Sequence, residues 1–121
     1  TANHLELLKN GEWDIYVSAF VSAPTGDPEY FFTTHCLQDS SKNRGGYYSE
    51  PLETLEQQLS GEFDTEKRTE LAIEMTQTLL DDHMFFFASH LKMSMVSGEG
   101  VTGLVAHPCD YYEITVNLDK K

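Results

Sequence analysis

The stretch from residue 64 to residue 82, DTEKRTELAIEMTQTLLDD, constrains the fold more than any other part of this sequence. Leu71, Met75 and Leu79 recur at helical spacing and form one apolar face. Asp64 precedes them as a residue typical of a helix N-cap. The pattern predicts an amphipathic helix of nearly five turns, and an ordinary apolar fraction of 40% predicts a packed core.

Three shorter helices are expected besides this one, over residues 4–9, 29–35 and 51–59. The last has proline in its first turn and leucines at i, i+3 and i+7, which is typical of a surface helix with one narrow apolar stripe. Asp27 and Pro28 form a favourable start for the helix over 29–35, with the aspartate as its cap.

Three further segments are typical of β-strands: WDIYVSAFV at 13–21, MFFFASHLKMSMVS at 84–97 and YYEITVNL at 111–118. The second of these is expected to form either two short strands or one bent strand. The first is apolar on both of its faces, and such strands belong inside the sheet of an α/β protein. We therefore expect an α/β fold with a mixed sheet flanked by helices.

Charge and length exclude several classes of protein. Eight basic residues against 20 acidic ones give a net charge of −12, which disfavours a nucleic-acid partner because such partners are held by Lys and Arg. No apolar run approaches the roughly 20 residues that a membrane span needs.

At 121 residues the chain fits one domain, residues 1–121. Cys36 and Cys109 are compatible with a disulfide, two free thiols or part of a metal site.

Candidate ligand-binding residues gather after the first expected strand. In open α/β sheets ligands bind at the carboxyl ends of strands, which gives weight to the turn with Pro24 and Thr25 and to His35, a candidate metal ligand. The polar loop over 38–51 adds further candidates: Arg44 to grip a carboxylate, and Tyr47 and Tyr48 to wall a pocket. For each, a purely structural role is the alternative.

The order of four segments, SAPTGDPEYFF, GGYYSEPLETLEQQL, DTEKRTELAIEMTQTLLDD and MFFFASHLKMSM, resembles a known family. It is similar to the C-terminal portion of the family 5 solute-binding proteins of peptide and nickel ABC transporters. The resemblance implies part of a type II periplasmic-binding-protein-like lobe, in a C-terminal fragment of a two-lobed protein. It also implies a non-enzymatic, monomeric substrate-binding component that delivers its ligand to an ABC permease. We expect it to be extracellular, periplasmic or membrane-tethered as a lipoprotein.

The resemblance also bears on the ligand. Peptide-binding members carry an aspartate that anchors the peptide amino group where this chain has Pro24, so the nickel-binding branch is preferred. The implied ligand is Ni²⁺ or a related metal with an organic chelator, with His35 as the metal ligand and no resident cofactor. Binding of an oligopeptide or another small solute is the alternative within the family. A small metal-dependent enzyme using His107, Cys109 and Asp110, and a purely structural interaction domain, are the alternatives from other classes.

Overall fold

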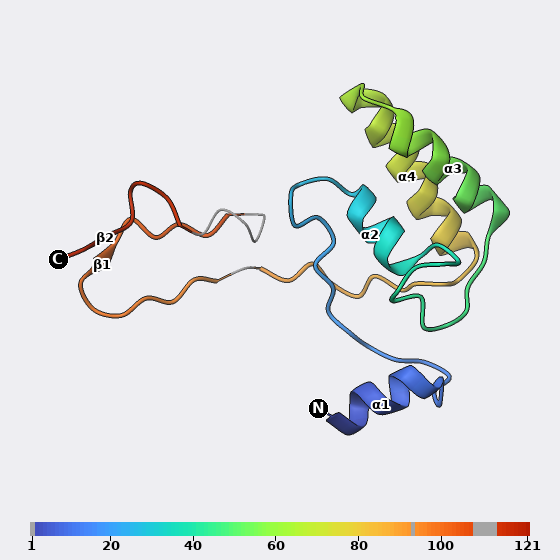
Figure 1. The fold of residues 1–121 in the computed structure, drawn as a ribbon, viewed down its shortest axis with the longest axis horizontal. Helices are drawn as coiled ribbons and strands as arrows, with labels where there is room; N and C mark the ends of the chain where they lie inside the picture. Colours follow the sequence, from blue (N-terminus) through green and yellow to red (C-terminus); the bar gives the residue numbers. More distant parts are fainter. Residues whose placement is uncertain (1, 93, 108–113) are drawn as a thin grey trace.

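A computed structural model describes residues 2–92, 94–107 and 114–121. Over these residues the chain forms a cluster of helices, a separate N-terminal helix and a distant two-stranded hairpin (Figure 1). The helices are α1 (Ala2–Asn10), α2 (Glu29–His35), α3 (Glu50–Gly61) and α4 (Thr65–Asp81), and the strands are β1 (Val101–Thr102) and β2 (Asp119–Lys120).

The long helix α4 forms where its sequence predicts it. The backbone N–H of Lys67 donates a hydrogen bond of 3.0 Å to the carboxylate of Asp64, which is therefore the N-cap. At the other end His83 adopts a left-handed φ of 57°, and its N–H donates to the carbonyl of Leu80. A left-handed residue after the last turn is a common way for a helix to end, because the chain then leaves the helix axis.

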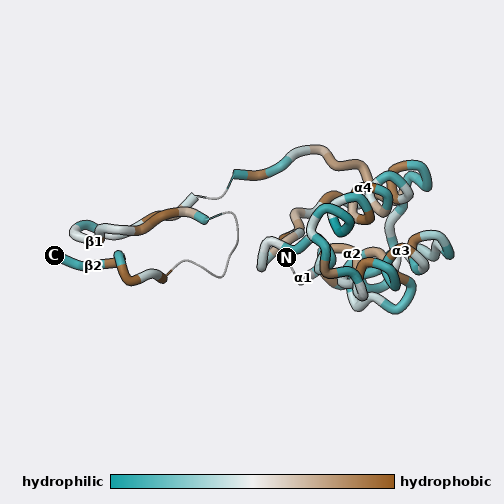
Figure 2. The backbone as a smooth tube through the Cα atoms, turned by 90° about the horizontal axis from the view of Figure 1, so that it is seen from above, coloured by the Kyte–Doolittle hydropathy of each residue, from teal (hydrophilic) through white to brown (hydrophobic). Residues whose placement is uncertain are grey.

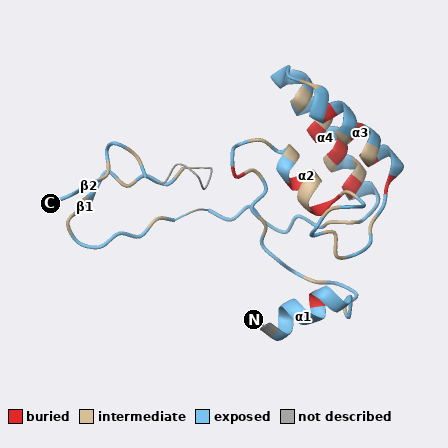
Figure 3. Ribbon diagram, in the orientation of Figure 1, coloured by how far each residue is buried: buried red, intermediate tan, exposed pale blue. Residues whose placement is uncertain are grey.

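The core lies between α2, α3 and α4, where the predicted apolar faces meet (Figure 3). Leu59, Met75 and Leu79 are fully buried, with 0% of their surface exposed. Burying each of these side chains contributes roughly 1.5–3 kcal/mol. The buried cluster consists of Phe31, Phe32, Cys36, Leu52, Leu55, Leu59, Ala72, Met75 and Leu79. The predictions of helices over 29–35, 51–59 and 64–82 are confirmed, and they account for most of this core.

The expected α/β lobe with a mixed sheet flanked by helices is wrong. Segments 13–21 and 84–97 contain no strand within the described residues. The sheet of the described chain consists of β1 and β2 alone, which pair antiparallel with Val101 opposite Lys120 and Thr102 opposite Asp119. The third expected strand is likewise absent over its described part, 114–118. A strand forms only if another strand accepts its backbone hydrogen bonds, and the described chain supplies none to these segments.

The two long extended segments consequently leave apolar side chains in solvent. Ile15 is 87% exposed and Val17 85%, and Val96 is 93% exposed. Figure 2 shows apolar stretches along the extended segment between α4 and β1. Segment 13–21 has the alternation of a strand, but neither segment has a partner strand within the described residues.

Helix α1 stands apart from the cluster (Figure 1). Its Leu8 is 3% exposed, and the indole N–H of Trp13 donates a hydrogen bond of 3.4 Å to the Leu8 carbonyl. Leu8 is thus buried locally and not in the main core. Across the described helices, none has the length and apolarity that a membrane crossing requires.

Candidate functional site

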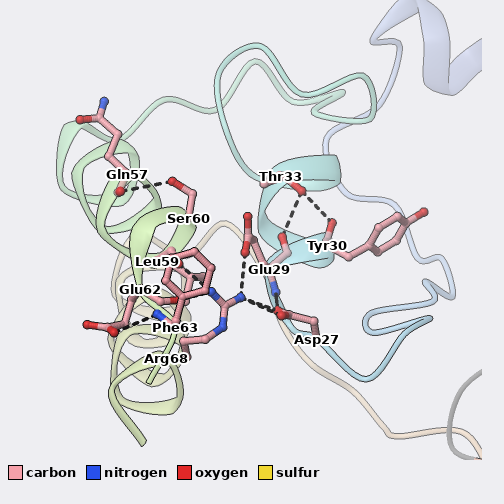
Figure 4. Close-up of polar contacts among 10 residues, drawn as sticks. All are labelled: Asp27, Glu29, Tyr30, Thr33, Gln57, Leu59, Ser60, Glu62, Phe63 and Arg68. Carbon is pink, nitrogen blue, oxygen red and sulfur yellow. Dashed lines mark hydrogen bonds and ion pairs between the residues drawn. The ribbon is translucent and has the colours of Figure 1, made fainter. Parts of the chain in front are cut away.

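Arg68 fixes the turn at 22–28 to the helical cluster (Figure 4). Its Nη2 donates to both carboxylate oxygens of Asp27, at 2.9 and 2.7 Å, and to Glu29 Oε2 at 2.8 Å. Its Nη1 donates to the carbonyl oxygens of Leu59 at 2.7 Å and Glu62 at 2.8 Å. One guanidinium group therefore joins the start of α2, the end of α3 and the first turn of α4.

The same contacts show what holds the predicted Pro24–Thr25 turn. Asp27 Oδ1 also accepts the N–H of Glu29 at 2.9 Å, so this carboxylate satisfies a backbone donor at the start of α2, one residue before the N-cap position at Pro28. Pro24 is buried and Thr25 is exposed. Hydrogen bonds to Glu29 and then Asp27 raise the pKa of Arg68, so this guanidinium is charged whenever the protein is folded.

His35, at the C-terminal end of α2, lies in an aromatic environment. Its ring meets Phe20 edge-on at 4.4 Å between centroids and stacks on Phe31 at 5.5 Å, and the residue is 3% exposed. Nδ1 is buried and has no hydrogen-bond partner within the described part of the chain. Burial, followed by the charges of Lys42 and Arg44, lowers the pKa of His35 from 6.5 to about 4. The imidazole is therefore neutral at neutral pH.

Four phenylalanines form an aromatic cluster, and two of them, Phe20 and Phe31, contact this histidine. Phe31 contacts Phe85 at 5.5 Å and Phe87 at 6.1 Å, and Phe85 lies 6.2 Å from Phe20. The cluster joins residues from three separate segments. Sequence reasoning assigned Phe85 and Phe87 to a strand and missed their role here, although the shared richness of EYFF and MFFF in phenylalanine was a signal.

The loop over 36–49 is folded back onto α2 and held by side-chain hydrogen bonds. Asn43 Nδ2 donates to the carbonyls of Leu37 and Tyr47, at 3.0 and 2.7 Å, and its Oδ1 accepts the Tyr47 N–H at 3.1 Å. Nearer the helix, the Lys42 N–H donates to the Thr34 carbonyl at 3.2 Å. Asn43 was not among the predicted site residues, but it organises the loop that carries three of them.

The three predicted loop residues have different surroundings. Tyr47 packs against the core, and its hydroxyl donates a hydrogen bond of 2.6 Å to Asp82 just beyond α4. Burial and then this hydrogen bond raise the pKa of Tyr47 to about 12. Tyr48 is 57% exposed, whereas Arg44 is half-buried and near enough to His35 to lower its pKa.

The structure thus divides the predicted residues into two groups. His35, Arg44 and Tyr47 lie around the C-terminal end of α2, whereas the turn with Pro24 and Thr25 precedes its N-terminal end. A helix of seven residues separates them by about 10 Å. They do not converge on one small cavity, so any single ligand touching both groups must span the length of α2.

The residues proposed for metal binding are only partly within the structure. Over residues 2–92, 94–107 and 114–121, no group of three or more His, Cys, Asp or Glu side chains is placed to hold a metal ion. Burial raises the pKa of the Cys36 thiol to about 12, so it is protonated at neutral pH and is no thiolate ligand. Cys109 and Asp110 lie outside the described residues, and His107 is half-buried.

Comparison with known proteins adds no relative. No family model, no curated protein and no solved structure matches the chain.

Proposed function

We propose that this chain belongs to the substrate-binding component of an ABC importer, and that it captures a nickel or related metal chelate. The order of sequence segments that resembles the peptide and nickel solute-binding proteins supports the class. The single observation that supports the ligand is the neutral, buried imidazole of His35 beside two cationic side chains, Lys42 and Arg44.

The chemistry of this arrangement suits a metal held by a carboxylate-bearing chelator. A neutral imidazole nitrogen is a favourable ligand for Ni²⁺, Cu²⁺ and Zn²⁺, and Nδ1 of His35 has no protein partner among the described residues. Lys42 and Arg44 offer cations to the chelator's carboxylates in a chain that is otherwise strongly acidic.

Access to His35 requires an aromatic ring to move. Nδ1 is buried, and of the two rings that contact the imidazole Phe31 is 8% exposed whereas Phe20 is only partly buried. A rotation of the Phe20 ring is a smaller change than the opening of the helical core, because this ring does not belong to the fully buried set. We therefore place ligand entry on the Phe20 side of α2.

An oligopeptide is the second candidate ligand, and the extended segment 13–21 favours it. This segment runs directly into the Pro24–Thr25 turn, and within the described residues it forms no hydrogen bond from main chain to main chain. Main-chain groups of this kind bind extended peptides as added strands. Such a mode needs no aspartate at the position of Pro24.

Native mass spectrometry of the protein purified from rich medium without chelators separates these ligands. A bound mass with a nickel isotope pattern and an organic component supports the metal chelate. A distribution of peptide masses supports the second candidate and contradicts the first. The absence of any bound small molecule, after Ni²⁺ and citrate are also added, contradicts both.

Isothermal titration with Ni²⁺ premixed with citrate then tests the role of His35. His35→Gln removes the imidazole but keeps a polar side chain, and we expect at least a tenfold weaker Kd. His90→Gln is the matched control because His90 is exposed on an extended segment, and it should leave the Kd unchanged. Equal titrations of the two variants would show that His35 does not bind the metal.

A further inference from the structure

The solvent side of α4 carries a second apolar stripe that the core does not use. Ile73 is 64% exposed and Leu80 is 40% exposed. They border an open hollow of about 310 Å³, which we call the α4 groove. The groove is lined by Pro28, Thr69, Ala72, Ile73, Thr76, Gln77 and Leu80. On α4 these positions follow the i, i+3, i+4, i+7 spacing of one helix face.

Packing within the helical cluster does not explain this stripe. The core face of α4 is formed by Met75 and Leu79, both fully buried, with Ala72 at its border. A surface helix needs only one such face to hold it in place. Ile73, on the opposite side of the helix, adds nothing to this core, so its side chain is available for contact with a partner.

Carboxylates lie on α4 between the groove and a second hollow beside α3, which Glu70 and Glu74 line. Glu66, Glu70 and Glu74 follow one another at i+4 spacing, and Asp81 continues the same side of the helix. All four are exposed, and none belongs to an ion pair with a described residue. The basic side chains of α4 are already engaged, Lys67 by Glu62, and Arg68 by Asp27 and Glu29.

We propose that the α4 groove docks a basic amphipathic helix of a partner protein. Its apolar side chains at i, i+3, i+4 and i+7 lie against Ile73 and Leu80, as in other helix-in-groove complexes. Its lysines or arginines lie along the carboxylate edge of α4, where opposite charge sets orientation and accelerates association.

Charge argues against the other occupants of this surface. A second copy of the chain brings the same carboxylate edge and a net charge of −12, so it is repelled. An anionic membrane surface is repelled for the same reason. A basic partner is the one that this surface attracts.

The test uses the full 121-residue chain and two synthetic 16-residue helical peptides. Both carry leucine at i, i+3, i+4 and i+7; one has lysines along the flank and the other has glutamates there. Fluorescence anisotropy should show binding of the lysine peptide and none of the glutamate peptide. Equal binding of the two peptides overturns the proposed role of the carboxylate edge.

Variants of the chain locate the binding surface. Ile73→Gln should weaken binding of the lysine peptide at least tenfold. Phe63→Gln should leave this binding unchanged, because Phe63 is 91% exposed but lies outside the groove. Glu70→Gln combined with Glu74→Gln should weaken binding and reduce its dependence on salt. If Ile73→Gln binds as the unaltered chain does, or Phe63→Gln loses as much affinity, the groove is not the docking site. Circular dichroism of each variant confirms that α4 is retained.

Discussion

The helical cluster and the extended segments are both rich in apolar residues, but the cluster buries these side chains whereas the extended segments expose them to solvent. In the cluster, Leu59, Met75 and Leu79 have no exposed surface. In segment 13–21, Ile15 and Val17 are more than four-fifths exposed, at 87% and 85%. Hydrophobicity alone therefore does not decide burial in this chain.

The difference lies in where each kind of element finds its hydrogen bonds. A helix satisfies its backbone within itself, so α3 and α4 need only each other and α2 to bury their apolar faces. An extended segment has to pair with a second strand before its side chains form a sheet face. The described chain lacks that second strand for 13–21 and 84–97, so their side chains stay in solvent.

The largest expected effect comes from truncating the core. Leu79→Ala should lower the free energy of unfolding by about 2–5 kcal/mol, because it leaves a cavity at a fully buried position. Val17→Ala removes apolar atoms from an exposed position and should change stability by less than about 0.5 kcal/mol. Urea unfolding followed by circular dichroism measures both. Similar losses in the two variants would show that segment 13–21 is buried after all.

The next effect concerns the guanidinium that joins three helices. Arg68→Met keeps the apolar stem but removes the bonds to Asp27 and Glu29 and to the carbonyls of Leu59 and Glu62. The midpoint of urea unfolding should fall clearly, although by less than in Leu79→Ala. Lys67→Met is the control, since its one ion pair, to Glu62, is long at 3.9 Å and exposed. Equal midpoints for these two variants would contradict the assigned role of Arg68.

A smaller effect is expected where the loop meets α4. Tyr47→Phe removes only the hydroxyl that donates to Asp82, and a single hydrogen bond contributes about 0.5–1.5 kcal/mol. The same change should lower the protection of the loop amides in hydrogen exchange. Tyr48→Phe is the matched control, as Tyr48 is 57% exposed. Unchanged exchange of the loop in Tyr47→Phe would show that this bond does not anchor it.

The last effect concerns the pH dependence of stability, and it is small at neutral pH. The pKa of His35 is about 4 in the folded protein and 6.5 when unperturbed, so the unfolded chain binds a proton first as pH falls. Its contribution to stability is complete above about pH 6.5 and is lost as pH falls toward 4. His35→Gln should therefore show a flatter decline between these values. Denaturant midpoints at several pH values measure this, and parallel curves would mean that the imidazole is not desolvated.

Local sequence signals were enough for the helices and for one part of the candidate site. Asp64 as the cap of α4 and Asp27 as an acceptor for a backbone N–H at the start of α2 were both predicted, because each acts on residues two or three positions away. The apolar faces of α3 and α4 were predicted for a similar reason, because the residues of one helix face recur every three or four positions in the sequence.

Contacts between distant residues could not be predicted in this way. The partner of Arg68, Asp27, is 41 positions away in the chain. His35 was predicted at the edge of a sheet and lies instead against Phe20 and Phe31. The strand over 13–21 was predicted from alternating side chains and those over 84–97 from an apolar run, and neither signal reveals whether a partner strand exists.

The chain's own short-range pattern specifies α2, α3 and α4, their caps and the faces they bury, because helical hydrogen bonds and capping contacts span only a few residues. The fold in three dimensions settles the rest: the joining of three helices by Arg68, the neutral state of His35 and the exposure of the extended segments. Each of these depends on which distant groups come together, and on the free energy of bringing them out of water.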